Sequence, residues 1–257
     1  MSVRLDIAEH VARVTIDRPE VLNALDMEAE ASLEDIWQRL EADRDVRAVV
    51  LTGAGERGFC VGSDMKNVGK SGLEYWAAAR PNGFGGIALR TTLDVPVIAR
   101  VNGHALGGGF EMVLGCDIVI AAQEATFGLP EPRVGRLPLD GGMVLLARQI
   151  PFRQAMGMLL TGRRISAAQA LAWGLLNEVV PRAELDTAVD RWLADILACA
   201  PLSLRAIKQT VRRTAQLAAA EAQALRLPAL IECLQSADGD EGVRAFREKR
   251  APEWSGR

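Results

Sequence analysis

The stretch VPVIARVNGHALGGGFEMVLGCDIVIAA, residues 95–122, carries the signals that decide the fold. Its two ends, 95–101 and 117–122, are short apolar runs rich in valine and isoleucine, which is typical of strands buried on both faces of a parallel sheet. Between them, a run of glycines opens a short apolar helix over 107–115. A strand, a helix and a second strand in this order predict an α/β architecture with buried parallel strands.

The same alternation of strands and helices extends toward the N-terminus. Residues 3–8 and 11–17 alternate apolar and polar side chains, which predicts a short β-hairpin. Residues 27–42 carry apolar side chains at helical spacing, and the β-branched run 47–52 predicts another buried strand. We therefore expect these segments to join the same sheet.

The character of the chain changes after residue 181. The segments that follow are rich in alanine and leucine at helical spacing, and no strand pattern returns. We expect helices over 184–199, 201–222 and 223–234. The sequence thus predicts an α/β core over 1–181 and a C-terminal helical region over 182–257.

Composition narrows the class of protein. The chain has 257 residues, a formal net charge of -3 and an isoelectric point near 5.6. A nucleic-acid-binding domain normally carries a basic surface, so this charge argues against such a function. Four cysteines without close pairing and two histidines argue against a metal site. The N-terminus has no apolar leader, and no run of about 18 uncharged apolar residues occurs. We expect a cytoplasmic protein with no nucleic-acid or membrane partner.

One glycine motif suggests a dinucleotide site. Gly53-Ala-Gly-Glu-Arg-Gly58 follows a strand and fits the pattern G-x-G-x-x-G. Its last glycine should open a helix, but the next residues, 59–64, are β-branched and contain another glycine. We therefore interpret the motif as a glycine turn that leaves a strand.

Three other segments point to chemistry at a carbonyl group: Phe59-Cys-Val-Gly-Ser-Asp-Met-Lys66, His104-Ala-Leu-Gly-Gly-Gly-Phe-Glu111 and Phe127-Gly-Leu-Pro-Glu131. The first two place glycine-rich backbone after predicted strands, where amide N–H groups can approach an anion closely. The second also opens a helix, whose N-terminus favours negative charge. Two such elements that face each other would form an oxyanion hole.

Glu111 and Glu131 are the candidate acid and base beside this site. Taken singly, Glu111 is also explained as a first-turn glutamate that favours the helix dipole, and Glu131 as an exposed loop acid. Their occurrence together with the two glycine segments favours a catalytic role.

The three segments resemble the signature of the crotonase (enoyl-CoA hydratase/isomerase) family, and the resemblance covers nearly the whole chain. Further matches are Asp17-Arg-Pro-Glu-Val-Leu-Asn-Ala-Leu25, the stretch 161–180 and the ending 245–257. The resemblance implies a spiral of strand–strand–helix turns with a C-terminal helical region. It also implies a homotrimer or homohexamer, an acyl-CoA thioester as substrate and a place in fatty acid metabolism.

Carried over to this chain, the resemblance places the oxyanion hole at the backbone N–H groups of Ser63 and Gly108. Glu111 and Glu131 occupy both glutamate positions of the hydratases, which implies a lyase that adds water to a 2-enoyl-CoA or removes it. Because coenzyme A is part of the substrate, no cofactor and no metal are expected. The alternatives are an isomerase or an acyl-CoA hydrolase on the same scaffold, or a non-catalytic binding protein.

The resemblance also assigns Asp64, Lys66, Phe246 and Lys249 to substrate binding, the last two at the adenine end of coenzyme A. Where the hydratases have Pro-Gly-x-Gly-Gly, this chain has Pro138-Leu-Asp-Gly-Gly142. Gly83-Phe-Gly-Gly86, Phe127-Gly-Leu-Pro-Glu131 and the tryptophan-containing ending together look most like the carnitinyl-CoA dehydratase branch. We expect Asp140 either to line the acyl pocket, where it would meet a charged or polar substituent, or to cap the helix that begins near Gly141.

Overall fold

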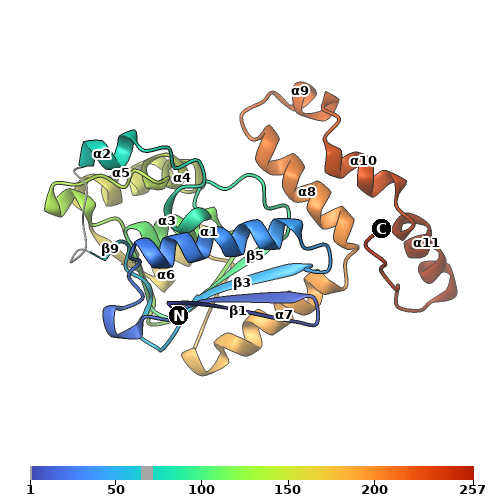
Figure 1. Ribbon diagram of the computed structural model, residues 1–257, viewed down its shortest axis with the longest axis horizontal. Coiled ribbons are helices and arrows are strands. Elements are labelled where there is room, and N and C mark those ends of the chain that lie inside the picture. The colour runs from blue at the N-terminus through green and yellow to red at the C-terminus, as the bar shows by residue number, and fades with distance from the viewer. Residues whose placement is uncertain (1, 65–71) are drawn as a thin grey trace.

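A computed structural model describes residues 2–64 and 72–257, and it contains two β-sheets with helices packed around them (Figure 1). The large sheet consists of β1 (Val3–Ala8), β2 (Val11–Ile16), β3 (Ala48–Gly53), β5 (Val97–Val101), β7 (Ile118–Ala122) and β10 (Glu178–Val180), in that order. β1 and β2 form the predicted antiparallel hairpin, and every later neighbour pair in this sheet is parallel. The prediction of an α/β fold with buried parallel strands is confirmed.

The small sheet consists of β4 (Gly58–Cys60), β6 (His104–Leu106), β8 (Thr126–Gly128) and β9 (Arg164–Ser166). Its strands have only three residues each, which is too short for an alternating pattern, and β4, β6 and β9 were not predicted. Gly58 begins β4 rather than a helix, as the interpretation of the glycine motif at 53–58 required.

The two sheets are built by a spiral of the chain. β3 leads into β4, β5 into β6 and β7 into β8, so each turn places one strand in the large sheet and the next strand in the small sheet. The second and third turns then continue into α3 (Gly108–Gly115) and α4 (Gly142–Gln149). This is the strand–strand–helix order that the resemblance implied.

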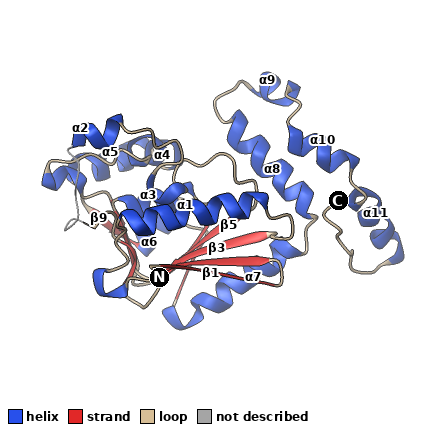
Figure 2. Cartoon of the chain, in the orientation of Figure 1, coloured by secondary structure: helices blue, strands red, loops and turns tan. Residues whose placement is uncertain are grey.

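Helices cover both faces of the large sheet (Figure 2). On one face lies α1 (Met27–Ala42), whose Leu33 and Trp37 pack with Val49 and Leu51 of β3. On the other face lies α7 (Leu185–Leu197), which packs against the alternate side chains of the same strands. α1 begins where it does because the Asp26 carboxylate accepts a hydrogen bond of 2.9 Å from the Ala29 N–H. The remaining helices of the core are α2 (Gly72–Ala77), α5 (Phe152–Thr161) and α6 (Ala167–Ala172), with the 3-10 helices η1 (Pro19–Val21), η3 (Phe84–Gly86), η4 (Glu131–Val134) and η5 (Arg182–Glu184).

The C-terminal region is helical, and no strand follows β10 in the described chain. After α7 come α8 (Pro201–Thr214), α9 (Ala219–Ala224), α10 (Pro228–Gln235) and α11 (Asp238–Glu248). The helix predicted over 201–222 ends at Thr214, and the one predicted over 223–234 is interrupted before Pro228. Proline disfavours helical backbone in the residue before it, which explains the second break. None of the described helices is long and apolar enough to cross a membrane.

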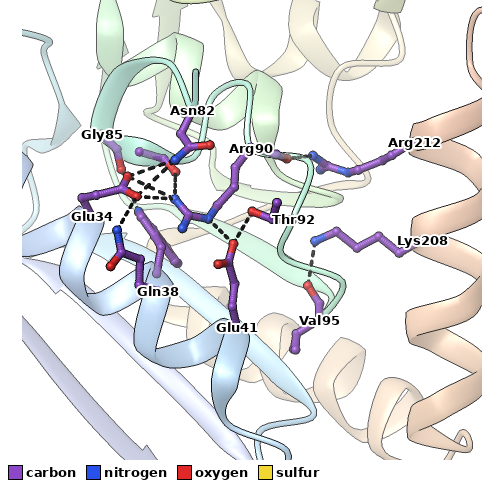
Figure 3. A network of polar contacts seen from close by, with 12 residues as sticks. Glu34, Gln38, Glu41, Asn82, Gly85, Arg90, Thr92, Val95, Lys208 and Arg212 are labelled. Atoms are coloured by element: carbon purple, nitrogen blue, oxygen red, sulfur yellow. Dashed lines mark hydrogen bonds and ion pairs between the residues drawn. The ribbon is translucent and has the colours of Figure 1, made fainter. Parts of the chain in front are cut away.

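Buried ionic contacts fix the loop between η3 and β5 to its neighbours (Figure 3). The Arg90 guanidinium, 2% exposed, donates to Glu34 at 3.1 Å and to Glu41 at 2.6 Å, both on α1. From the other side, Arg212 of α8 donates to the Arg90 carbonyl at 3.1 Å, and Lys208 donates to the Val95 carbonyl at 2.6 Å. The loop is thereby held between α1 and the helical tail.

Candidate active site

The three glycine-containing segments meet because they follow adjacent parallel strands. β4, β6 and β8 are neighbours in the small sheet and run in the same direction. Their carboxyl ends therefore lie at one edge, where residues 61–64, 107–111 and 129–131 emerge together. The Gly107 N–H donates to the Gly128 carbonyl at 2.9 Å, which joins the second segment to the third.

Glycine is required where these segments approach each other. Gly62 has φ of +93°, and a Cβ there would lie 3.1 Å from the Gly108 nitrogen. Ser63 forms an isolated parallel bridge with Leu25, in which the flanking residues 62 and 64 make the hydrogen bonds. Within the described residues we find no acceptor for the N–H of Ser63 or of Gly108, so both remain available to a ligand.

Glu111 lies in the first turn of α3 and is 2% exposed. Its Oε1 accepts hydrogen bonds from two main-chain N–H groups, that of Asp140 at 3.0 Å and that of Gly142 at 2.7 Å. Burial raises the pKa of Glu111 to about 8, and the charges of Asp140 and Glu131 act in the same direction, while the two N–H donors oppose the shift. Burial is the larger effect, so this carboxyl retains its proton at neutral pH.

Glu131 begins η4 and faces the same region from the other side. Its Oε1 lies 2.8 Å from the position that a Cβ on Gly107 would occupy, which places the carboxylate against the glycine segment before α3. Its Oε2 is buried and has no hydrogen-bond partner among the described residues. Burial raises the pKa of Glu131 as well.

A cavity of about 1160 Å³ connects these groups. Its walls include Ser63, Glu111 and Glu131, and also Tyr75, Arg80 and Asp140. The volume is that of a site for a sizeable organic molecule rather than for a single ion. A buried and a half-buried carboxyl group beside two unused N–H donors can move protons at a carbon next to a polarised carbonyl group.

Asp140 lines this cavity and is 6% exposed. Its Oδ2 accepts a hydrogen bond from the Tyr75 hydroxyl, and its Oδ1 lies 3.3 Å from Nε of Arg80. Arg80 also donates to both carboxylate oxygens of Glu30, at 3.1 and 3.0 Å, and its guanidinium lies 4.6 Å from the centre of the Tyr75 ring. We call Glu30, Tyr75, Arg80 and Asp140 the Arg80 cluster.

The alternative role of Asp140 as a helix cap is wrong. The N-cap residue of α4 is Gly141, with φ of +127°, and it has no side chain that could accept a hydrogen bond from the helix. The carboxylate of Glu111 takes that place, because it accepts from the N–H of Gly142, the first residue of α4. The Asp140 side chain is directed instead at Tyr75 and Arg80.

Comparison with known proteins agrees with this geometry. The model of the enoyl-CoA hydratase/isomerase family matches residues 6–257. The chain belongs to this family. It is 39% identical to a carnitinyl-CoA dehydratase of Proteus mirabilis, over 100% of this chain and 99% of the relative. It is 41% identical to an (E)-benzylidenesuccinyl-CoA hydratase of Thauera aromatica, over the full length of both.

Solved structures of enoyl-CoA hydratases have the same fold. The enzyme from Bacillus anthracis superimposes with a TM-score of 0.91 at 32% identity, over 100% of both chains. The enzyme from Mycobacterium tuberculosis H37Rv superimposes with a TM-score of 0.89 at 30% identity, over 100% of this chain and 99% of the other. The predicted crotonase-type spiral is therefore confirmed.

Three other residues that the family resemblance assigned to substrate binding, Asp64, Phe246 and Lys249, are not among the described residues that line the cavity. The Asp64 carboxylate lies 3.2 Å from Arg18. Lys66 lies outside the described residues. Phe246 lies on α11 and is 85% exposed, and Lys249 ends that helix with φ of +55°. Figure 1 places α11 at the opposite end of the molecule from α2, so a single chain does not bring these two residues to the cavity.

Sequence reasoning did not identify Glu30, Tyr75 and Arg80. They come from α1, α2 and the loop after α2, and the glycine segments give no signal for them. One feature could have indicated Tyr75, since it is the only tyrosine in the chain.

Proposed function

We propose that this protein is a lyase that reversibly adds water to the double bond of a 2-enoyl-CoA thioester. The observation that carries the proposal is a cavity lined by Glu111, Glu131 and Ser63, beside which the N–H groups of Ser63 and Gly108 have no acceptor among the described residues. The relatives named hydratases and dehydratases support the same reaction.

The two N–H groups serve the thioester oxygen. When water adds at the β-carbon, the electron pair of the double bond moves toward the carbonyl and the oxygen becomes an enolate oxygen. Two N–H donors from Ser63 and Gly108 stabilise that charge, and each is expected to lower the barrier by about 3–4 kcal/mol. The proton then added at the α-carbon restores the thioester carbonyl.

The glutamates supply the proton transfers. The reaction needs one carboxylate to take a proton from water and one carboxylic acid to protonate the α-carbon, so the active pair holds one proton. Glu111, with a pKa of about 8, retains its proton at neutral pH. Activity should therefore be lost above about pH 8, where Glu111 loses its proton. This holds whether Glu111 or Glu131 takes the proton from water.

The first test is hydration of crotonyl-CoA, followed by the loss of enoyl-thioester absorbance. Glu111→Gln and Glu131→Gln should each lower kcat by about 10²–10⁴, because each removes one proton transfer. Glu124→Gln is the matched control, since Glu124 is 57% exposed and lies outside the cavity. Near-wild-type turnover in either cavity variant, with an intact circular dichroism spectrum, would show that its glutamate is not catalytic.

The same assay separates the alternatives. Absorbance loss without free thiol indicates hydration, whereas thiol release indicates an acyl-CoA hydrolase. Movement of the double bond in a 3-enoyl-CoA without net hydration indicates an isomerase. No reaction with a panel of acyl-CoA thioesters would favour a binding protein.

We infer that the protein works as a homotrimer or homohexamer. Large apolar side chains remain exposed on the helical tail, namely Ile207, Val211, Leu234 and Phe246. A second copy would cover such a surface, and it would also supply Phe246 and Lys249 to the adenine end of a neighbour's coenzyme A. A mass equal to one chain, measured by light scattering at micromolar concentration, would contradict this inference.

A cytoplasmic location, a place in fatty acid metabolism and the absence of any cofactor beyond the coenzyme A of the substrate are parts of the same proposal. In the proposed reaction, N–H groups of residues 60–64 and 107–111 stabilise the enolate oxygen, so no step requires a metal ion. Hydration activity that survives chelation and exhaustive dialysis would support this part.

A further inference from the structure

Residue 140 joins the Arg80 cluster to Glu111. Its main-chain N–H donates to Glu111 Oε1 at 3.0 Å, beside the donor from Gly142. Its side chain faces the other way, toward the Tyr75 hydroxyl and Nε of Arg80. One residue therefore contacts both Glu111 and the other members of the Arg80 cluster.

Arg80 is the central cation of this arrangement. It lies between two carboxylates, with Nη2 donating to Glu30 and Nε 3.3 Å from Asp140, and one of its faces covers the Tyr75 ring. The side chain of Arg80 is 26% exposed and that of Asp140 is 8% exposed, so water screens these charges incompletely. The cluster ties α1, α2 and the residue before Gly141 into one unit.

We propose that Arg80 and Asp140 are positioning residues for Glu111, because their ion pair holds residue 140 in the orientation that fixes the Glu111 carboxylate and sets the charge beside it. The inference rests on the proposed hydration reaction and extends it to residues that do not exchange protons with the substrate. It also means that an acyl group which contacts Arg80 or Tyr75 would affect the position and charge environment of Glu111 through Asp140.

The charges around Glu111 predict in which direction each substitution should shift the pKa of this residue. Asp140 and Glu131 are the ionisable groups that raise the pKa of Glu111, and Arg80, backed by Glu30, partly neutralises Asp140. Removing the Asp140 charge should let Glu111 lose its proton at lower pH. Removing the Arg80 charge leaves Asp140 uncompensated, so Glu111 should keep its proton to higher pH.

The experiment measures kcat/KM for crotonyl-CoA hydration from pH 5 to 10 in the full-length protein. We expect the upper limb of the profile to move down by about 0.5–1.5 pH units in Asp140→Asn and up by about as much in Arg80→Gln. Asn keeps the main-chain N–H and an oxygen that can accept from the Tyr75 hydroxyl, so its fold should be intact. Arg80→Lys keeps the charge and should restore the wild-type limb even where its kcat is lower.

Arg13 and Asp190 provide the matched control, since they form an ion pair of 3.1 Å whose side chains are 44% and 61% exposed, away from the cavity. Arg13→Gln and Asp190→Asn should leave the profile unchanged. Shifts in the same direction for Asp140→Asn and Arg80→Gln, or upper limbs that do not move, would overturn the inference. A wild-type protein without hydratase activity would instead overturn the proposed function, so the two failures are distinguishable.

Discussion

At the scale of single residues, Glu111 illustrates how burial and hydrogen bonding oppose each other. Two main-chain donors, at the N-terminus of α4, favour its charged form. Desolvation and the two neighbouring carboxylates favour the neutral form, and together they outweigh the donors, so the pKa rises to about 8. A fully solvated carboxylate would be ionised at neutral pH and would repel Glu131.

This shift predicts a pH-dependent effect on stability. The pKa of Glu111 is about 8 in the folded protein against 4.5 for an unperturbed glutamate, so its contribution to stability is complete below pH 4.5 and is lost as pH rises through 8. Glu111→Gln cannot ionise and keeps the acceptor oxygen. Wild type should therefore lose stability between pH 5 and pH 8.5 through this group, whereas Glu111→Gln should not. We expect the free energy of unfolding of the variant minus that of wild type to increase by about 2–4 kcal/mol from pH 5 to pH 8.5. Urea denaturation at the two pH values measures the difference, and equal values would contradict the burial argument.

At the scale of elements, the close approach of α3 to β4 depends on small residues at the helix N-terminus. A Cβ on Gly109 would lie 2.0 Å from the Cys60 carbonyl oxygen, and one on Gly108 would lie 2.5 Å from the Phe84 ring. α3 is buried along its whole length, so it cannot move away without opening the core. The glycines therefore set the distance between the two sides of the proposed oxyanion hole.

Gly109→Ala should destabilise the protein by about 2 kcal/mol or more and should lower hydration activity, because α3 must shift away from main-chain atoms. Gly157→Ala is the matched control: Gly157 lies inside α5, and a Cβ there would meet nothing within 4 Å. That change should stabilise the protein by about 0.5–1 kcal/mol, since alanine favours helix over glycine. Thermal and urea unfolding compare the two variants. Similar effects of both would mean that the contact with Cys60 does not control the position of α3.

At the scale of the whole molecule, the helical tail is joined to the core through buried cations of α8. Lys208 is 8% exposed and donates to the Val95 carbonyl at 2.6 Å, and its ammonium lies 2.7 Å from Asp117. Burial lowers the pKa of Lys208, while Asp117 opposes that shift. Arg212, one turn further along α8, also pairs with Asp117, at 2.8 Å. The tail is thus fixed beside the loop that carries Arg90 (Figure 3).

Lys208→Met should destabilise this junction by about 2–4 kcal/mol, because it keeps the apolar stem but leaves the Val95 carbonyl without its donor. The neighbouring change Ile207→Met, at a position 59% exposed on the same helix, should alter stability by less than about 0.5 kcal/mol. Urea denaturation gives the magnitudes, and limited proteolysis shows whether cleavage increases between α7 and α11. Unchanged stability in Lys208→Met would mean that the other contacts of α8, those of Arg205, Gln209 and Arg212, hold the tail without Lys208.

Local patterns in the sequence determined the strands of the large sheet other than β10, the helix over 27–42 and the glycine-opened helix that carries Glu111. Each depends on side-chain periodicity or on glycine within a window of a few residues, and such signals act before any long-range contact forms. The three glycine segments and both glutamates could be named for the same reason. Their roles in the reaction remain predictions.

Only the tertiary structure decided what these segments meet. The three-residue strands of the small sheet carry no period of their own and are defined by their neighbours. Tyr75, Arg80 and Asp140 are joined by contacts across as many as 65 positions of the chain, so no local window contains the cluster. The same holds for the carboxylate of Glu111 at the start of α4, where sequence alone favoured Asp140 equally as a cap. Contacts of this kind depend on the order of strands in the sheets, which folding establishes and local propensity does not encode.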